Sequence, residues 1–107
     1  MHLNNVKKAI ARVELEDLDK DIEKYACRPL DSTYPSGIKP TMDADGYFTS
    51  VMLESLDCAD FKLGKEKECS ATLLQGTFQL ELNKKYALHS GKRRIGRIEF
   101  REFSEFY

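Results

Sequence analysis

The stretch that decides the fold runs from Lys85 to Ile98 and reads KYALHSGKRRIGRI. Tyr86-Ala87-Leu88-His89 and the return from Arg93 to Phe103 alternate between apolar and polar positions, a period of two that is typical of half-buried strands. Between them, Ser90-Gly91-Lys92 supplies a tight turn. The stretch therefore predicts a β-hairpin. Its expected inward residues are Ile95, Ile98 and Phe100.

Further short strands are expected on the N-terminal side of this hairpin. Ala9–Glu16 alternates and places four apolar side chains on one side: Ala9, Ala11, Val13 and Leu15. Tyr47–Leu53 is rich in aromatic and β-branched residues, Glu68–Leu74 follows a charged turn, and Phe78–Leu82 alternates cleanly. About five to seven short strands, with turns roughly every 8–12 residues, indicate a small barrel or sandwich. We therefore predict one all-β domain over residues 1–107, of the size common for a single domain.

One short helix and one irregular connection interrupt the strand pattern. Leu15, Leu18, Ile22 and Tyr25 fall at helical offsets, and Asp17 is a suitable N-cap, so a helix is predicted at about residues 18–25. Residues 27–46 contain all three prolines and are expected to form a long irregular connection. Asp43-Ala44-Asp45-Gly46 is expected to turn the chain into the next strand.

The hairpin resembles the closing β-hairpin of the C-terminal barrel of elongation factor Tu and related translation GTPases. That family has an aromatic-alanine-hydrophobic run, a glycine turn followed by arginine, and a hydrophobic-glycine pair, which match Tyr86-Ala87-Leu88, Gly91 to Arg93, and Ile95-Gly96. Upstream, Ser36–Pro40 is similar to the family's glycine-tyrosine-arginine-proline segment, with Ile38 and Lys39 in place of the tyrosine and arginine. Arg28-Pro29 would occupy the arginine-bearing loop before it. The similarity runs in the same order from Ala9 to Phe100.

The resemblance implies a six-stranded antiparallel barrel of a kind that contacts tRNA and other proteins. It implies no GTPase, because the chain lacks a phosphate-cradling G-x-x-x-x-G-K-[ST] motif. Two glycines of the hairpin have a physical reason to recur. Gly91 can adopt the positive φ of a tight turn, and Gly96 permits a bulge or a close backbone approach where a barrel closes.

Composition favours a small cytoplasmic protein. The chain is 41% apolar with mean hydropathy −0.53, and it shows neither a secretory signal nor an apolar run of the ~18 residues that a membrane span needs. The three cysteines have no paired spacing and are expected to be reduced thiols: Cys27, Cys58 and Cys69. We therefore expect a cytoplasmic location and no membrane partner.

No constellation of residues predicts catalysis, a metal site or a cofactor. The two histidines are His2, near the first residue, and His89, beside the hairpin turn, and neither spacing suggests a nucleophile with its base. The cysteines lack the paired spacing of a structural zinc site. Asp43-Ala44-Asp45-Gly46 lacks the glutamate of a calcium loop. We predict a protein that is not an enzyme and has no small-molecule substrate.

Two charged segments are the candidate binding sites. Residues 1–60 hold 7 Lys and Arg against 12 Asp and Glu, whereas residues 61–107 hold 10 against 6. The acidic segment is a solvated face or a docking surface for a basic protein: Glu14, Glu16, Asp17, Asp19, Asp21 and Glu23. The basic cluster is an ordinary strand face or an RNA contact: Lys84, Lys85, Lys92, Arg93, Arg94, Arg97 and Arg101.

Two classes of function follow from these segments. The first is a bacterial immunity or antitoxin protein that blocks a cognate toxin by direct protein–protein binding, through the acidic segment. The second is an RNA- or ribosome-associated module that uses the basic hairpin over 84–101. A dedicated RNA binder normally has a clear basic excess. The formal charge of −1 therefore favours the first class.

Overall fold

The hairpin forms as predicted in a computed structural model of the chain, which describes residues 5–17, 24–25, 37–57, 61–74 and 80–107. Strands β7 (Lys85–Ser90) and β8 (Arg93–Phe106) pair antiparallel around the two-residue turn Gly91-Lys92. Gly91 has φ 61°, the positive value that the first position of such a turn requires.

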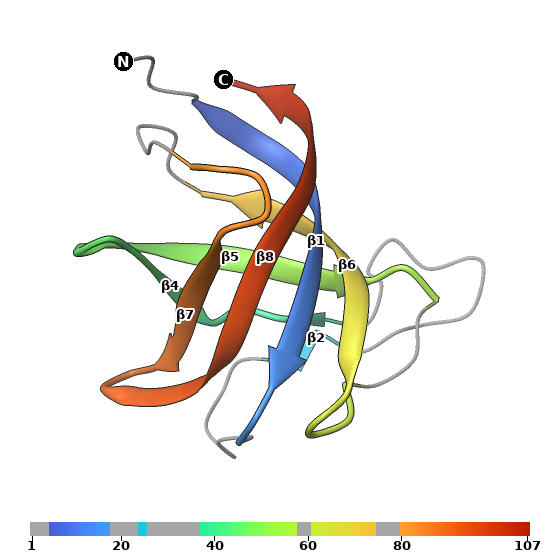
Figure 1. Cartoon of the computed structure of the whole chain (residues 1–107), viewed down its shortest axis with the longest axis vertical. Coiled ribbons are helices and arrows are strands. Elements are labelled where there is room, and N and C mark those ends of the chain that lie inside the picture. Colours follow the sequence, from blue (N-terminus) through green and yellow to red (C-terminus); the bar gives the residue numbers. More distant parts are fainter. Residues whose placement is uncertain (1–4, 18–23, 26–36, 58–60, 75–79) are drawn as a thin grey trace.

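Six antiparallel strands close into a barrel (Figure 1). The ring runs from β5 (Tyr47–Ser55) through β4 (Thr41–Ala44), β7, β8 and β1 (Val6–Leu15) to β6 (Glu66–Leu73). The additional pairing of β5 with β6 closes it. The predicted all-β fold is thus confirmed as a small closed barrel. Every neighbouring pair in the ring is antiparallel.

Two very short strands extend the barrel at one edge of β5. Strand β3 (Gly37–Ile38) pairs with β5 on the same edge as β4, and β2 (Lys24–Tyr25) pairs with β3. The irregular connection predicted over 27–46 is therefore wrong for its last part, because residues 37–44 carry β3 and β4. Pro40 lies between these two strands, so its missing N–H removes no ladder hydrogen bond. Its carbonyl accepts from Val51 N–H at 3.0 Å.

The core follows the predicted alternation of the strands. The four inward residues of β1 are no more than 1% exposed: Ala9, Ala11, Val13 and Leu15. On β8, Ile95, Ile98 and Phe100 are fully buried as predicted. Small side chains on β1 leave room inside the ring for large ones from other strands, such as Phe100, Met42 and Leu53.

Gly96 lies where the barrel closes, as predicted. A Cβ at this position would lie 2.2 Å from the carbonyl oxygen of Glu14, closer than any side chain can approach. The β7–β8 register also shifts between Leu88 and His89, so a bulge lies beside Gly96. Gly37 makes the same kind of approach to the carbonyl oxygen of Leu53, at 2.2 Å.

The Asp45-Gly46 turn joins β4 to β5, as the sequence predicts. Asp45 and Gly46 have φ values of 55° and 95°. Positive φ at both central residues is the geometry of the Asp-Gly hairpin turn. Gly46 N–H also donates to Asp43 Oδ1 at 2.7 Å, so a side chain of β4 stabilises the turn.

The strand predicted over Phe78–Leu82 is wrong in the part that the structure describes. Residues 80–82 are not in a strand, and residues 78–79 lie outside the described part. Glu81 N–H donates to the Tyr86 hydroxyl at 2.9 Å instead of to a ladder carbonyl. The chain then turns at Asn83, which has φ 64°. Asn adopts a positive φ more readily than most residues, which favours a turn at this position.

The helix predicted at 18–25 falls mostly on residues 18–23, which lie outside the described part. Its last two residues, Lys24 and Tyr25, belong to β2 and are extended. They are held by pairing with Ile38 and Gly37, so a long-range contact overrides the helical offset there. Within the described residues, no helix is long and apolar enough to cross a membrane.

The burial of Phe100 generates a stability prediction. Its ring contacts those of Tyr86 and Phe103, with centroid distances of 6.0 and 5.9 Å, and it is 0% exposed. Phe100→Ala should lower the free energy of unfolding by about 3–5 kcal/mol in denaturant melts. Tyr47→Ala is the control, because Tyr47 is 72% exposed and its loss should cost under about 0.5 kcal/mol. Equal costs for the two variants would contradict this assignment of the core.

Candidate functional site

The pairing of β1 with β8 brings the acidic and basic segments together on one face of the barrel. Glu14 lies opposite Arg97 in the register, and Glu14 Oε2 is 2.7 Å from Arg97 Nη2. Arg97 Nη1 is 3.6 Å from Glu16 Oε1. The two candidate sites are therefore adjacent and partly neutralise each other.

Two more arginines continue this pairing beyond the end of β1. Arg94 Nη2 lies 4.0 Å from Glu16 Oε1, and Arg93 forms an ion pair with the Asp17 carboxylate. The backbone N–H groups of Glu16 and Asp17 both donate to the Ile95 carbonyl, at 2.7 and 3.1 Å. β8 thus supports both the backbone and the side chains of the described part of the acidic segment.

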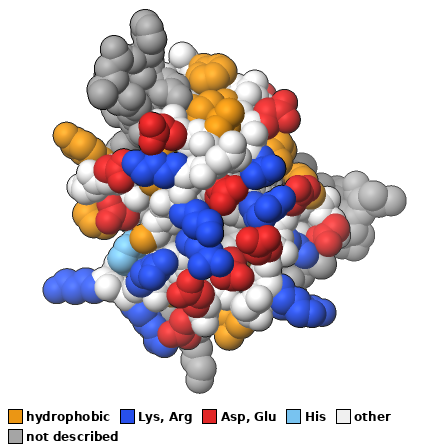
Figure 2. Space-filling model, in the orientation of Figure 1, with side chains coloured by type: hydrophobic (Ala, Val, Ile, Leu, Met, Phe, Trp, Pro, Cys, Tyr) orange, Lys and Arg blue, Asp and Glu red, His pale blue; other side chains and the backbone are white. Residues whose placement is uncertain are grey.

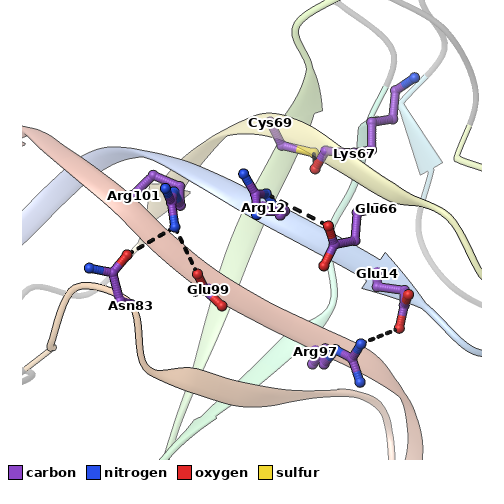
Figure 3. Close-up of polar contacts among 9 residues, drawn as sticks. All are labelled: Arg12, Glu14, Glu66, Lys67, Cys69, Asn83, Arg97, Glu99 and Arg101. Atoms are coloured by element: carbon purple, nitrogen blue, oxygen red, sulfur yellow. Dashed lines mark hydrogen bonds and ion pairs between the residues drawn. The ribbon is translucent and has the colours of Figure 1, made fainter.

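Charge alternates across the strands in one row of this face, whereas in the neighbouring row Glu14 lies opposite both Arg97 and Glu66. From β7 to β6, Lys85 lies opposite Glu99, Glu99 opposite Arg12, and Arg12 opposite Glu68. Arg12 Nε also reaches diagonally to Glu66 Oε2, at 3.8 Å (Figure 3). Together, the charged residues of these strands form a surface that we call the charged face. It comprises Arg12, Glu14, Glu16, Asp17, Glu66, Glu68, Lys85, Arg93, Arg94, Arg97 and Glu99.

Figure 2 shows blue and red side chains interleaved over this face, with neither sign forming a continuous patch. A small hollow of about 10 Å³ lies among six of the charged side chains, enough for about one water molecule. The six are Arg12, Glu14, Glu66, Lys85, Arg97 and Glu99. The face therefore offers an ordered pattern of charge rather than a pocket.

Two of the three remaining basic residues, Arg101 and Lys84, are also near acidic groups. Arg101 Nη1 donates to Glu99 Oε1 and to Asn83 Oδ1, each at 3.0 Å (Figure 3). Lys84 Nζ lies 2.6 Å from Asp45 Oδ2, and this hydrogen bond raises the pKa of Lys84. Lys92 is exposed in the hairpin turn. Asp19, Asp21 and Glu23, the rest of the predicted acidic site, lie outside the described residues.

The candidate nucleophile Cys69 and the candidate base His89 lie in different environments. Cys69 is fully buried on β6, whereas His89 is half-buried on β7 and packs edge-on against Phe48 with 6.2 Å between ring centroids. Burial raises the pKa of the Cys69 thiol to about 12, which keeps it protonated and poorly nucleophilic. Burial also raises the pKa of Tyr86, whose hydroxyl accepts from Glu81 N–H. Cys27 and Cys58 lie outside the described part.

An open groove of about 340 Å³ lies beside the start of β5. Its described lining is Thr41, Phe48, Thr49, Ser50 and Leu74, which includes no titratable side chain. Among the residues that the structure describes, no group of three or more His, Cys, Asp or Glu side chains is placed to hold a metal ion.

The exposed aromatic residues at the end of β8 were not predicted from the sequence. Phe106 and Tyr107 are 56% and 58% exposed at the end of β8, and Phe103 is half-buried beside them. The period of two predicts inward or outward positions, but it does not show where a strand extends beyond its neighbour. The signal available was length, because apolar residues recur from Ile95 to Phe106, over a longer stretch than the six residues of β7.

No family model matches the chain, and no curated protein matches it.

The Arg97–Glu14 pair generates a prediction about the charged face. The two side chains are 33% and 19% exposed, so the pair is less screened by water than its neighbours. A double-mutant cycle with Arg97→Ala and Glu14→Ala should give a coupling free energy of about 0.5–1 kcal/mol. The coupling should fall in about 1 M NaCl, where the Debye length is roughly 3 Å.

The control for this cycle is the Arg12–Glu66 pair, which is longer and more exposed. Its coupling should be below about 0.5 kcal/mol. Equal coupling in both pairs, or a coupling that salt does not change, would show that Arg97 and Glu14 stabilise the fold through packing rather than charge.

The Cys69 thiol generates a prediction about pH. Its pKa is about 12 in the folded chain against an ordinary 9.0, so above pH 9.0 the unfolded chain ionises first. The stability that Cys69 contributes should therefore be complete below pH 9.0 and decline as the pH rises toward 12. Denaturant melts of the natural chain and of Cys69→Ala between pH 7 and 10.5 should show their stability difference shrinking above pH 9.0. A constant difference would mean that the thiol ionises equally in both states.

Proposed function

We propose that this chain is a non-catalytic binding protein of the bacterial cytoplasm, which neutralises a cognate toxin by direct protein–protein contact. The support comes from its size, its charge balance and the character of the charged face. A rigid barrel surface with an ordered pattern of both charges suits a single protein partner. Complementary charges steer association and suppress wrong partners.

The pairing of the arginines is the observation that carries the proposal. Arg93, Arg94, Arg97 and Arg101 each have a carboxylate within 4.0 Å. Binding of nucleic acid draws its affinity from cations that neutralise phosphates and release counterions. Arginines already paired with carboxylates would have to exchange these partners for phosphates, which reduces the gain in binding free energy. The arrangement therefore supports a protein partner over RNA.

We also propose that the barrel is related to the C-terminal barrel of elongation factor Tu. Three features support this. The chain forms a six-stranded antiparallel barrel, β7 and β8 form the hairpin that carries the resemblance, and Gly96 makes a close backbone approach. In this view the chain uses the barrel of a translation factor as a scaffold, and its outer face has acquired a different partner.

The charged face would act through its pattern, with Glu16 and Asp17 at the end of β1 as the centre of the contact. Both are about half exposed, and their backbone is held by hydrogen bonds to Ile95. These carboxylates already pair with Arg93 and Arg94, so a partner would add its basic groups to the half-exposed oxygens without replacing the arginines. Little conformational entropy is then lost on binding.

A charge-swap variant tests this proposal without removing the internal ion pair. Asp17→Arg with Arg93→Asp keeps opposite charges at the two positions but inverts the pattern that a partner meets. We expect stability within about 0.5 kcal/mol of the natural chain. We expect association with the toxin encoded beside this chain to slow by about tenfold or more, measured by surface plasmon resonance. Lys65→Glu is the control, an exposed change of charge in the turn before β6.

Two results would contradict the proposal. In the first, expression of the chain rescues cells from none of the toxins encoded beside it. In the second, the purified protein binds tRNA with a dissociation constant of about 1 µM or tighter at physiological salt, and Arg93→Glu with Arg94→Glu removes that binding. The second result would support the RNA- or ribosome-associated function instead.

A further inference from the structure

The end of β8 carries a strand edge that has no partner in the described part of the chain. β1 pairs with β8 along its whole length, from Gly96 to Phe106. β7 pairs with the opposite edge of β8 only as far as Glu99. One more backbone bond follows, from Asn83 N–H to the Phe100 carbonyl at 2.9 Å. Beyond this point, no described strand pairs with that edge of residues 101–106 (Figure 1).

This edge is held in an extended form by contacts on its other side. The Ser104 hydroxyl donates to the Lys8 carbonyl at 3.0 Å, and Tyr107 N–H donates to the Asn5 carbonyl at 2.7 Å. The Tyr107 hydroxyl donates to the Leu73 carbonyl at 2.5 Å. An extended edge that is already ordered loses little entropy when another strand pairs with it.

Exposed aromatic side chains accompany the edge. The rings of Phe103 and Phe106 contact each other with 6.4 Å between centroids, and Phe103 in turn contacts buried Phe100 at 5.9 Å. Figure 2 shows hydrophobic side chains gathered near the end of β8, next to the charged face. An unpaired edge with exposed apolar groups is a site for strand pairing.

We propose that this edge pairs with the same edge of a second copy of the chain, in an antiparallel two-fold dimer centred on Phe103. In this register Arg101 of each copy lies opposite Glu105 of the other, and Phe103 lies opposite Phe103. Opposite charges and aromatic pairs placed across two strands are both favourable. Arg101 Nη1 already donates to Glu99 and Asn83, so the other guanidinium donors of Arg101 would take the Glu105 carboxylate. The contact is isologous, as a two-fold axis requires.

The charges select this register over its neighbours. A shift that places Phe103 opposite Ser104 brings Glu102 opposite Glu105 twice, which is unfavourable. A shift in the other direction places Arg101 opposite Ser104 and loses both ion pairs. Charged edge residues normally prevent strand pairing, and here they permit one complementary partner.

The structure also sets the length of the shared ladder. Asn83 N–H already occupies the Phe100 carbonyl, so the ladder spans residues 101–105. A ladder this short gives a small interface, and we expect a weak dimer with a dissociation constant between about 1 µM and 1 mM.

Sedimentation equilibrium of the whole chain over this concentration range tests the proposal. Glu105→Arg places two arginines opposite each other across each half of the dimer and should raise the dissociation constant about tenfold or more. Arg101→Glu should do the same. The double swap Arg101→Glu with Glu105→Arg should restore association to within about threefold of the natural chain. Circular dichroism establishes that each variant is folded.

The matched control is Glu102→Arg, which makes the same charge change on the same edge opposite Ser104. It should alter the dissociation constant by less than about threefold. A natural chain that stays monomeric at about 1 mM overturns the proposal. So does a dimer that neither single variant weakens, or one that the double swap fails to restore, since the edge would then pair in another register or with a strand of another protein.

Discussion

The close approach of Gly96 on β8 to the Glu14 carbonyl on β1 is the constraint on which the rest of the structure depends. Any Cβ at residue 96 would lie 2.2 Å from that oxygen, so the two strands can meet only because this position is glycine. Their pairing joins residues that are 81 to 100 positions apart in the chain, and because β1 also pairs with β6, β1 links the two parts of the ring. Closure removes most exposed strand edges and gives Ala9, Ala11 and Val13 an interior to face.

The same pairing creates the charged face. Inside the ring, alternate residues of β1 and β8 fill the core, so the residues between them must point outward in register. Arg12 and Glu14 then stand opposite Glu99 and Arg97, and two sequence segments of opposite net charge become one surface of mixed charge. Each exposed pair contributes little stability. The value of the pattern lies in selecting a partner, since a mixed surface matches far fewer proteins than a uniformly charged one.

We propose different roles for the two ends of β8. Near Gly96 the strand is paired on both edges, and its outward arginines meet the carboxylates at the end of β1. Beyond Phe100, β1 is the only described strand beside it, and the strand presents Phe103 and Phe106 along an edge that no described strand pairs with. The proposed toxin contact uses the first end and the proposed self-association uses the second. The two surfaces are separated along one strand, so a dimer would display two charged faces.

Local sequence determined the inside and outside of most strands, the turns at Gly91 and Asp45-Gly46, and the special position of Gly96. These depend on side-chain alternation and on φ, which a few neighbouring residues control. The same signal failed over residues 80–82, where the alternation is real but Asn83 and the Tyr86 hydroxyl divert the backbone from a ladder. The candidate site was predicted only as two separate charged segments. That they form one face, with Arg97 against Glu14, was decided by the tertiary structure, because a charge pair between distant strands exists only once the ring has closed.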